Sequence, residues 1–330
     1  MLQHNMGRAA IVMLKHNPPI TAAMTADADL AAARTLPRWL KRNVPKGNAN
    51  HFTARLLDEL GLETVCRAAR CPNRMECYAR RTATFLILGG MCTRACRFCG
   101  VGKAGPGAPP LPPDPDEPRR VAEAAARLGL RHVVVTCVTR DDLADGGAEH
   151  FARTIAEIRR ATAAAQDRTT VEVLPSDFGG STGAVDRLLR AAPEVYNHNA
   201  ETVPRLYRAI RGPRADYRWT LRMFRRIARQ NPAIRLKTGL MLGLGETVGE
   251  LLDTLADLAE AGCRMLTLGQ YLQPSPAQVP VARYVPVEEF DRLGDLARRL
   301  GFTQVAAGPL VRSSYHAREM VGGGDEGIRG

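Results

Sequence analysis

With 330 residues, 45% of them hydrophobic, the chain is long enough to bury the core of one large domain or of two smaller ones. Its formal charge of +12 favours an acidic protein partner, nucleic acid or an anionic membrane, without choosing among them. No nucleic-acid motif, no apolar run of membrane-spanning length and no secretory signal is visible. We therefore expect a cytoplasmic protein without a nucleic-acid or membrane partner.

The chain begins with an alanine-rich stretch, and we expect a disordered or surface-wrapping extension over residues 1–35. Residues 36–80 follow, with a proline-containing lead-in and a short helix expected near 51–60. This segment ends in a cysteine triplet with the spacing C-x4-C-x5-C, formed by Cys66, Cys71 and Cys77. We expect it to be the binding segment for an auxiliary iron–sulfur cluster.

A second cysteine triplet, Cys92, Cys96 and Cys99, follows the apolar run 84–88 with the spacing C-x3-C-x2-C. Disulfides are a poor interpretation, because the chain shows no secretory signal and can build its own core. A closed zinc site or an ordinary [4Fe–4S] cluster needs four protein ligands. Three thiolates can instead bind three irons of a cubane and leave the fourth iron open to an outside ligand. The two triplets therefore predict two iron–sulfur clusters.

Two further cysteines stand apart from the triplets. Cys137 lies in an apolar strand pattern, and Cys263 follows a helical pattern. Isolated cysteines in such places are most often small core residues. We expect no direct role for either.

Strand-like apolar runs alternate with helical patterns through residues 81–285. The expected strands lie near 83–88, 131–138, 170–174, 194–199, 234–242, 265–272 and 303–307. The expected helices lie near 117–129, 147–164, 181–191, 201–210, 216–230, 246–261 and 287–300. Repeated β–α units imply parallel strands. The pattern predicts an α/β fold, a partial (β/α)6-type TIM barrel, with residues 286–330 as a C-terminal helix and tail that close its mouth.

Local residue types predict the start of one helix and the end of another. The proline-rich stretch 105–118 is expected to lead into a helix with Asp116 as its cap and Pro118 in its first turn. In residues 246–261 the apolar side chains recur with the helical period, and Gly262 supplies the stop.

Polar side chains follow several of the expected strands, where parallel barrels place their active sites. Arg140 and Asp142 follow the second strand, and Asn197, Asn199 and Glu201 follow the fourth. A buried charge there needs a partner or a ligand, and Asn and Glu can bind the ammonium and hydroxyl groups of a cofactor. Simpler alternatives stay open, since Asp145 can cap a helix and His198 can be a satisfied core histidine.

Two weaker motifs complete the pattern. Gly243-Leu244-Gly245-Glu246-Thr247 opens a helix, but Val248 replaces the third glycine of the dinucleotide fingerprint, so that interpretation fails. The string Arg312-Ser313-Ser314-Tyr315 would usually be a plain turn. Beside a cluster that lacks a fourth cysteine, one of these serine oxygens is a hard and labile candidate ligand for iron.

Together these motifs resemble lipoyl synthases, a family of the radical S-adenosylmethionine (SAM) superfamily, from about Pro37 to Ala317. The C-x3-C-x2-C triplet alone indicates the superfamily. The upstream triplet and the Arg-Ser-Ser-Tyr string narrow the resemblance to the family. The string Gly239-x-Met241-x-Gly243-x-x-Glu246 resembles a superfamily element near the adenine of SAM, with Met241 in place of the usual isoleucine.

The resemblance implies that two sulfur atoms are inserted at carbons 6 and 8 of an octanoyl chain linked to a lysine of a carrier domain. The catalytic [4Fe–4S] cluster, which would reduce SAM to a 5′-deoxyadenosyl radical, is then bound by Cys92, Cys96 and Cys99. The second [4Fe–4S] cluster, which would donate sulfur, is bound by Cys66, Cys71, Cys77 and Ser314, with Ser314 favoured over Ser313. SAM contacts are expected from Phe98, Arg140, Asp142, Asn197, Asn199, Glu201, Gly243 and Glu246.

The implied partners are octanoylated carrier domains of 2-oxoacid dehydrogenase complexes, the glycine cleavage H protein, a flavodoxin- or ferredoxin-type reductant and iron–sulfur delivery proteins. Rival functions are a biotin synthase-like sulfur-inserting enzyme and a non-catalytic iron–sulfur carrier. Some positions depart from the family pattern: Gly90 stands in place of Asp, Arg97 in place of Pro, and Arg67-Ala68 in place of an acidic pair. None of these departures removes a cluster ligand.

Overall fold

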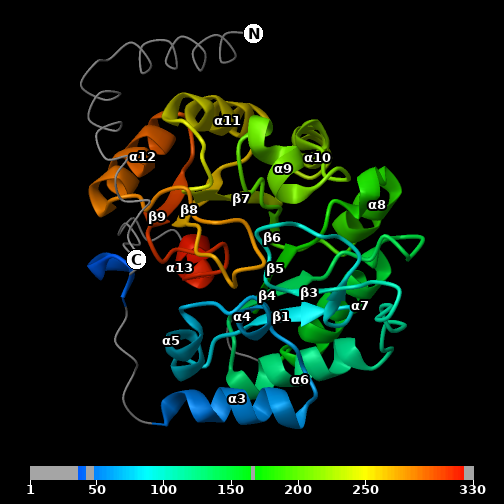
Figure 1. Ribbon diagram of the computed structural model, residues 1–330. Coiled ribbons are helices and arrows are strands. Elements are labelled where there is room, and N and C mark those ends of the chain that lie inside the picture. The colour runs from blue at the N-terminus through cyan, green and yellow to red at the C-terminus, as the bar shows by residue number, and fades with distance from the viewer. Residues whose placement is uncertain (1–35, 42–47, 165–167, 323–330) are drawn as a thin grey trace. The chain divides into compact units, whose positions relative to one another are not determined.

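The computed structural model describes residues 36–41, 48–164 and 168–322, and its helices and strands are labelled in Figure 1. The extension expected over residues 1–35 lies outside these described residues. The chain divides into two compact units. We call Asn43–His198 with Asn231–Ile234 the cysteine unit, and Met1–Arg42, Asn199–Gln230 and Arg235–Gly330 the C-terminal unit.

Four parallel strands form the sheet of the cysteine unit, in the order β1-β4-β5-β6. Their bounds are Thr84–Ile87, His132–Cys137, Thr170–Leu174 and Val195–Asn197. In the register, Val135 of β4 pairs with Phe85 of β1 on one side and with Val173 of β5 on the other. Because the strands are parallel, the loops that follow β1, β4 and β5 all lie at the carboxyl ends of the strands.

Three helices connect these strands, and consecutive helices pack on one another: α6 (Glu117–Leu128), α7 (Ala148–Ala161) and α8 (Thr182–Arg190). Pro118 lies in the first turn of α6, as predicted. Asp116 is the N-cap residue of this helix, as predicted, but its side chain makes no capping hydrogen bond. Asp116 already has near-helical angles, φ −93° and ψ −9°, and its carboxylate binds Arg119 at 2.8 Å instead of a backbone N–H. A capping side chain usually needs an extended backbone.

The segment before β1 contains α3 (Ala49–Glu59), α4 (Val65–Ala68) and α5 (Arg74–Ala79), of which only α3 was predicted. Tyr78 joins these helices. Its backbone oxygen accepts a hydrogen bond from Thr53 Oγ1, and its hydroxyl forms one with Thr64 Oγ1, both at 2.7 Å. Thr64 also pairs with Phe85 of β1. Two very short strands, β2 (Met91–Cys92) and β3 (Gly102–Lys103), bracket the second cysteine triplet.

The sheet of the C-terminal unit has three parallel strands, β7 (Arg235–Leu242), β8 (Met265–Gln270) and β9 (Gln304–Gly308), in that order. Its longer helices are α10 (Tyr217–Gln230), α11 (Val248–Glu260) and α12 (Val287–Arg299). The short ones are η2 (Arg38–Leu40), η4 (Pro204–Leu206), α9 (Tyr207–Arg211) and α13 (Ala317–Gly322). No helix within the described ranges is long and apolar enough to cross a membrane.

The strands and longer helices lie where the sequence pattern predicted them, in both units. In α11 the predicted apolar face is buried through Leu251, Leu252, Leu255 and Leu258. This helix starts with a capping box, in which Thr247 Oγ1 accepts from the Glu250 N–H and the Glu250 carboxylate accepts from the Thr247 N–H. Alternating β–α units with parallel strands confirm the α/β class.

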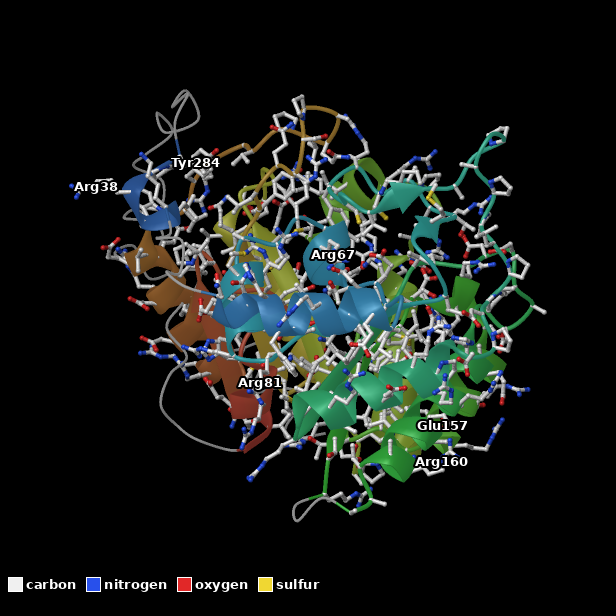
Figure 2. All side chains as sticks on the ribbon, turned by 90° about the horizontal axis from the view of Figure 1, so that it is seen from below. Arg38, Arg67, Arg81, Glu157, Arg160 and Tyr284 are labelled. Carbon is white, nitrogen blue, oxygen red and sulfur yellow. The ribbon has the colours of Figure 1, made fainter. Side chains whose placement is uncertain are left out.

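Part of the basic surface is made of paired charges. Figure 2 shows Glu157 and Arg160 side by side on α7, where they form an ion pair. Arg127 of α6 binds Glu59 of α3 at 2.7 Å. Exposed pairs of this kind stabilise a fold only slightly and keep the face solvated.

Candidate functional site

The loop that carries the second cysteine triplet leaves β1 through a strained residue, Leu88. This buried leucine has φ +68°, a left-handed conformation that a bulky side chain adopts only when its surroundings impose it. The Leu88 N–H donates to Glu117 Oε2 at 2.9 Å, and the Leu88 carbonyl accepts from Arg140 Nη1 at 3.0 Å. Glu117 Oε2 also hydrogen-bonds His150 Nε2 at 2.7 Å. Both polar groups of the Leu88 backbone are thus held by buried side chains.

The three cysteines of this loop are half-buried and are not joined in a disulfide. Cys92 lies in β2, and its carbonyl accepts from the Ala104 N–H at 2.8 Å, which closes the base of the loop. The Cys99 N–H donates to the Cys96 carbonyl at 3.2 Å, and Lys103 Nζ donates to the Cys99 carbonyl at 3.1 Å. The loop therefore presents three accessible sulfur ligands from a hydrogen-bonded backbone.

The upstream triplet is carried by short helices. Cys66 lies in α4 and Cys77 in α5, with Cys71 between them, and the Cys71 N–H donates to the Cys66 carbonyl at 3.1 Å. All three are free thiols. Burial, followed by the nearby Cys71, raises the pKa of the Cys66 thiol to about 11. Binding of iron there must displace a proton.

The donor chemistry of both triplets fits iron–sulfur clusters. Within the described residues, no three His, Cys, Asp or Glu side chains converge on one metal ion. A single-ion site needs such convergence, whereas a cubane takes each thiolate on a different iron. Each set offers three thiols that are not joined in a disulfide, one for each of three irons.

Of the other two cysteines, Cys263 is a core residue, as expected, whereas Cys137 is half-buried at the end of β4. Cys263 is fully buried, its Sγ donates to the Leu236 carbonyl at 3.4 Å, and burial raises its pKa to about 12. Burial likewise raises the pKa of Cys137 to about 12.

Arg67, one departure from the family pattern, is held away from the cysteine beside it. Its Nη1 binds Asp58 Oδ1 of α3 at 2.8 Å, and both side chains are partly exposed. Arg67 is labelled on α4 in Figure 2. The charge change near Cys66 is thus partly compensated by a neighbouring carboxylate.

Arg140, a predicted cofactor contact, is directed into the protein. Its side chain is only 2% exposed, and it donates to Leu88 O and, through Nε and Nη2, to the Asp142 carboxylate. Hydrogen bonding by Arg140 lowers the pKa of Asp142. The simpler interpretation of Asp145 holds, because its two oxygens accept from the Gly147 and Glu149 N–H groups at the start of α7.

Asn197 is the last residue of β6, and one of its side-chain polar atoms lacks a hydrogen-bond partner among the described residues. Its Nδ2 donates to Glu172 Oε1 at 2.8 Å, whereas its buried Oδ1 has no hydrogen-bond partner among the described residues. His198 Nδ1 lies 3.3 Å from the Pro175 carbonyl, in line with a core histidine. A buried carbonyl oxygen without a donor is costly, so Asn197 fits a ligand donor such as an ammonium group.

The C-terminal unit contains the remaining polar candidates. Asn199 Oδ1 is buried and has no partner within the described ranges. Glu201 has φ +69°, and its backbone bridges to β7, since its N–H donates to Gly239 O and its carbonyl accepts from Met241 N. Burial raises the pKa of the Glu201 carboxyl, and Arg211 opposes this. Asn199 and Glu201 are therefore held in place by the strand edge.

Gly243 and Glu246 shape the loop between β7 and α11. Glu246 accepts from the Gly243 N–H at 2.6 Å and from the Leu244 N–H at 2.9 Å, and burial raises the pKa of its carboxyl. Gly243 has φ +91°, and an added Cβ would lie 2.3 Å from Arg283 O. Only glycine fits this turn. The Glu246 carboxylate orders the loop backbone, and a cofactor contact by this loop remains an expectation.

The serine pair lies in a turn anchored at both ends. Val311 and Tyr315 are buried on either side, and the Tyr315 N–H donates to the Arg312 carbonyl at 2.9 Å. Ser313 and Ser314 are both half-buried between them. Their hydroxyls are thus presented by a fixed turn of the C-terminal unit.

Comparison with known proteins identifies the family. The model of the radical SAM superfamily matches residues 86–258. A lipoyl synthase of Rhodopirellula baltica is 57% identical over 298 residues, which cover 90% of this chain and 92% of that relative. The chain belongs to the lipoyl synthase family. A lipoyl synthase of Caldanaerobacter subterraneus subsp. tengcongensis is 52% identical over 85% of this chain and 95% of the relative.

Solved structures support the fold alone. HydG, a maturase of the [FeFe]-hydrogenase, matches with a TM-score of 0.56 at 15% identity, over 98% of this chain and 71% of that one. HydG from Carboxydothermus hydrogenoformans matches with a TM-score of 0.52 at 13% identity, over 96% and 74%. The predicted partial-barrel fold class is therefore confirmed.

Family membership settles the class of chemistry. The chain is a radical SAM sulfurtransferase, and it forms the lipoyl cofactor by sulfur insertion. Two [4Fe–4S] clusters and SAM are its cofactors. Each of the two cysteine triplets offers three thiols that are not joined in a disulfide.

Sequence reasoning missed several residues around the second triplet. Arg94, Glu117, His150 and Asp177 are buried and connect the loop, or its start at Leu88, to neighbouring elements. The sequence does contain one indication of this network. An arginine between cluster cysteines needs carboxylate partners if it is buried.

Proposed function

We propose that the two cysteine triplets divide the work of sulfur insertion. Cys92, Cys96 and Cys99 bind the cluster that engages SAM, and the upstream triplet binds the cluster that supplies sulfur. The observation that carries this assignment is the pair of three-thiol sets in one unit, each lacking a fourth cysteine. When bound, the clusters and SAM supply the electron, the 5′-deoxyadenosyl radical and the sulfur atoms.

The protein's own polar groups would orient SAM. Asn197 Oδ1 and Asn199 Oδ1 are buried acceptors without a partner in the described chain, and they suit the ammonium or hydroxyl groups of the cofactor. Phe98 is half-buried next to Cys99 and offers an apolar face. Glu201 and the Gly243–Glu246 turn complete the set. Arg140 and Asp142 act through the backbone, by fixing Leu88 at the start of the cysteine loop.

Ser314 would complete the upstream cluster as its fourth ligand. The fixed turn between Val311 and Tyr315 presents its hydroxyl. A serine oxygen binds iron less tightly than a thiolate, so it can be released when the cluster gives up sulfur.

The substrate is proposed to be an octanoyl chain on the lysine of a lipoyl carrier domain, modified at carbons 6 and 8. Carriers of this kind belong to 2-oxoacid dehydrogenase complexes and to the glycine cleavage system. The charge of +12 suits an acidic carrier surface and an acidic flavodoxin- or ferredoxin-type reductant. Iron–sulfur delivery proteins would rebuild the upstream cluster, and the cytoplasm would contain all of these partners.

The decisive experiment is anaerobic incubation of the reconstituted protein with SAM, a strong reductant and an octanoyl-lysine peptide, followed by mass spectrometry. A product with the mass of the dithiolane ring is expected. A parallel reaction with dethiobiotin as substrate should give no product. Sulfur insertion only into dethiobiotin would overturn the proposed substrate.

A further inference from the structure

Arg94 lies between Cys92 and Cys96, and its side chain is buried, with 8% exposed. Its Nε and Nη2 donate to the two oxygens of Asp141, both at 2.9 Å, in a two-point fork. Its Nη1 donates to Asp177 Oδ2 at 2.6 Å. The whole guanidinium therefore faces two carboxylates inside the cysteine unit.

The two carboxylates belong to different loops of the sheet. Asp141 follows β4 and Asp177 follows β5, and these strands pair with each other and, through β4, with β1. The cysteine loop follows β1. Arg94 thus ties together the loops at the carboxyl ends of three neighbouring parallel strands.

Thr93 strengthens the connection to the β4 loop. Its N–H and its hydroxyl both donate to the Thr139 carbonyl at 3.0 Å, and its Oγ1 accepts from the Asp141 N–H at 3.1 Å. In the loop itself, the Arg94 N–H lies 3.4 Å from Cys92 Sγ, at hydrogen-bond distance for sulfur. Arg94 therefore contacts a cluster ligand through its backbone and two loops through its side chain.

The side chains of this network are paired in their charged forms. Burial alone would raise the pKa of Asp177, but hydrogen bonding and charge from Arg94 bring it below its usual value. The Arg94 guanidinium is paired with a carboxylate on each side, Asp141 at 2.9 Å and Asp177 at 2.6 Å. Breaking a buried pair by removal of one partner leaves an uncompensated charge, which is strongly destabilising.

We infer that Arg94 is a positioning residue, which fixes the Cys92–Cys99 loop for cluster binding and, with Asp141 and Asp177, sets how easily that cluster is reduced. This rests on the proposed assignment of the SAM-engaging cluster to Cys92, Cys96 and Cys99. The planar guanidinium makes directional hydrogen bonds to two carboxylates at once. It therefore restricts the loop to one conformation more strongly than the ammonium group of a lysine would.

If these charges influence the cluster, substitutions of opposite charge should shift its midpoint potential in opposite directions. The three side chains carry +1 and −2, a sum of −1. Arg94→Gln changes the sum to −2, and Asp177→Asn changes it to 0. Because added negative charge near a cluster makes reduction harder, the two variants should shift the cluster midpoint potential in opposite directions. A purely structural defect would not give opposite signs.

The test compares Arg94→Gln, Arg94→Lys and Asp177→Asn with the parental protein. Arg159→Gln is the matched control, because Arg159 is also partly buried in the cysteine unit and ties α7 to the carbonyl of Ala191 and to Glu194. Each protein is reconstituted anaerobically in a background that lacks the upstream cysteines, Cys66, Cys71 and Cys77. Three quantities are measured: amide exchange of residues 91–100 in the cluster-free protein, iron release to a chelator, and midpoint potential by electron paramagnetic resonance.

Arg94→Gln and Asp177→Asn should both raise amide exchange in residues 91–100 and release iron about tenfold faster. Their midpoint potentials should move to more negative and more positive values, respectively. Arg94→Lys should keep a near-parental potential but exchange faster, whereas Arg159→Gln should match the parent in residues 91–100.

Parental exchange, iron release and potential in Arg94→Gln would overturn the inference, as would shifts of the same sign in Arg94→Gln and Asp177→Asn. Failure of the parental background protein to bind any cluster would instead overturn the ligand assignment. The two failures are thus distinguishable.

Discussion

The two cysteine triplets differ in what holds them. The loop from Cys92 to Cys99 leaves a buried strand and is fixed by charged and polar side chains, notably Arg94 and the groups around Leu88. The upstream triplet rests on short helices, joined by neutral hydrogen bonds to Tyr78. A cluster that engages SAM in every turnover profits from a rigid loop. In the proposed assignment the upstream cluster is dismantled and rebuilt, and its described scaffold, Ala49–Ala79, has no buried charged side chain that would be left unpaired when it opens.

The sharpest way to separate the triplets is to remove the ligands of the strand-end loop. Cys92→Ala, Cys96→Ala and Cys99→Ala in one protein should keep about half of roughly eight irons per chain and lose SAM cleavage entirely. Iron analysis and quantification of 5′-deoxyadenosine provide the measurement. Undiminished SAM cleavage would contradict the assignment of this loop.

The reciprocal change targets the helical triplet. A protein with Cys66→Ala, Cys71→Ala and Cys77→Ala should still cleave SAM under reducing conditions, but should form no lipoyl product, because the sulfur source is missing. The same assay reports both quantities by mass spectrometry. If this variant still inserts sulfur, the upstream cluster is not the donor.

A smaller change probes the fourth ligand of the upstream cluster. Ser314→Ala should leave both clusters able to assemble but block sulfur insertion, whereas Ser314→Cys should bind more tightly and also slow turnover. Ser313→Ala is the matched control and should retain activity. Product formation at the parental rate in Ser314→Ala would move the ligand to Ser313 or remove serine from the site.

The smallest expected effect concerns the scaffold of the helical triplet. Tyr78→Phe removes the buried hydrogen bond to Thr64 and should lower the free energy of unfolding by about 1 kcal/mol. Thr82→Ala, which removes an exposed hydrogen bond to the Arg80 carbonyl, should change it by less than about 0.5 kcal/mol. Denaturant titration of the cluster-free protein tests both. An equal loss in the two variants would show that Tyr78 has no special part in the scaffold.

The order of the strands and helices could be predicted because each strand is a short apolar run and each long helix has one buried face, as in α11. The short elements could not be predicted, since two-residue strands such as Met91–Cys92 have no periodicity. The start of α6 at Asp116 was predicted correctly, but the Asp116 side chain binds Arg119 instead of a backbone N–H, a competition that composition does not decide.

The cluster ligands could be proposed from spacing, but their supports could not. Asp177 lies 83 residues from Arg94 along the chain, and only the parallel pairing of β4 with β5 brings the Asp177 loop to the edge where Asp141 lies. Glu246 is a further example. The sequence predicts it as a cofactor contact, and the structure adds a role that spacing does not reveal, since both of its carboxylate oxygens accept backbone N–H bonds of the turn.

Gly147, at the start of α7, bears on how natural variants of this protein should be interpreted. It has φ +91°, and an added Cβ would lie 2.2 Å from Leu88 Cδ1. Any side chain at this position would push against the strained leucine from which the cysteine loop departs. A replacement of Gly147 is therefore expected to disturb the start of the cysteine loop, although 48 residues separate it from Cys99. Surveys that classify variants by distance from the ligands along the chain would place it among the harmless ones.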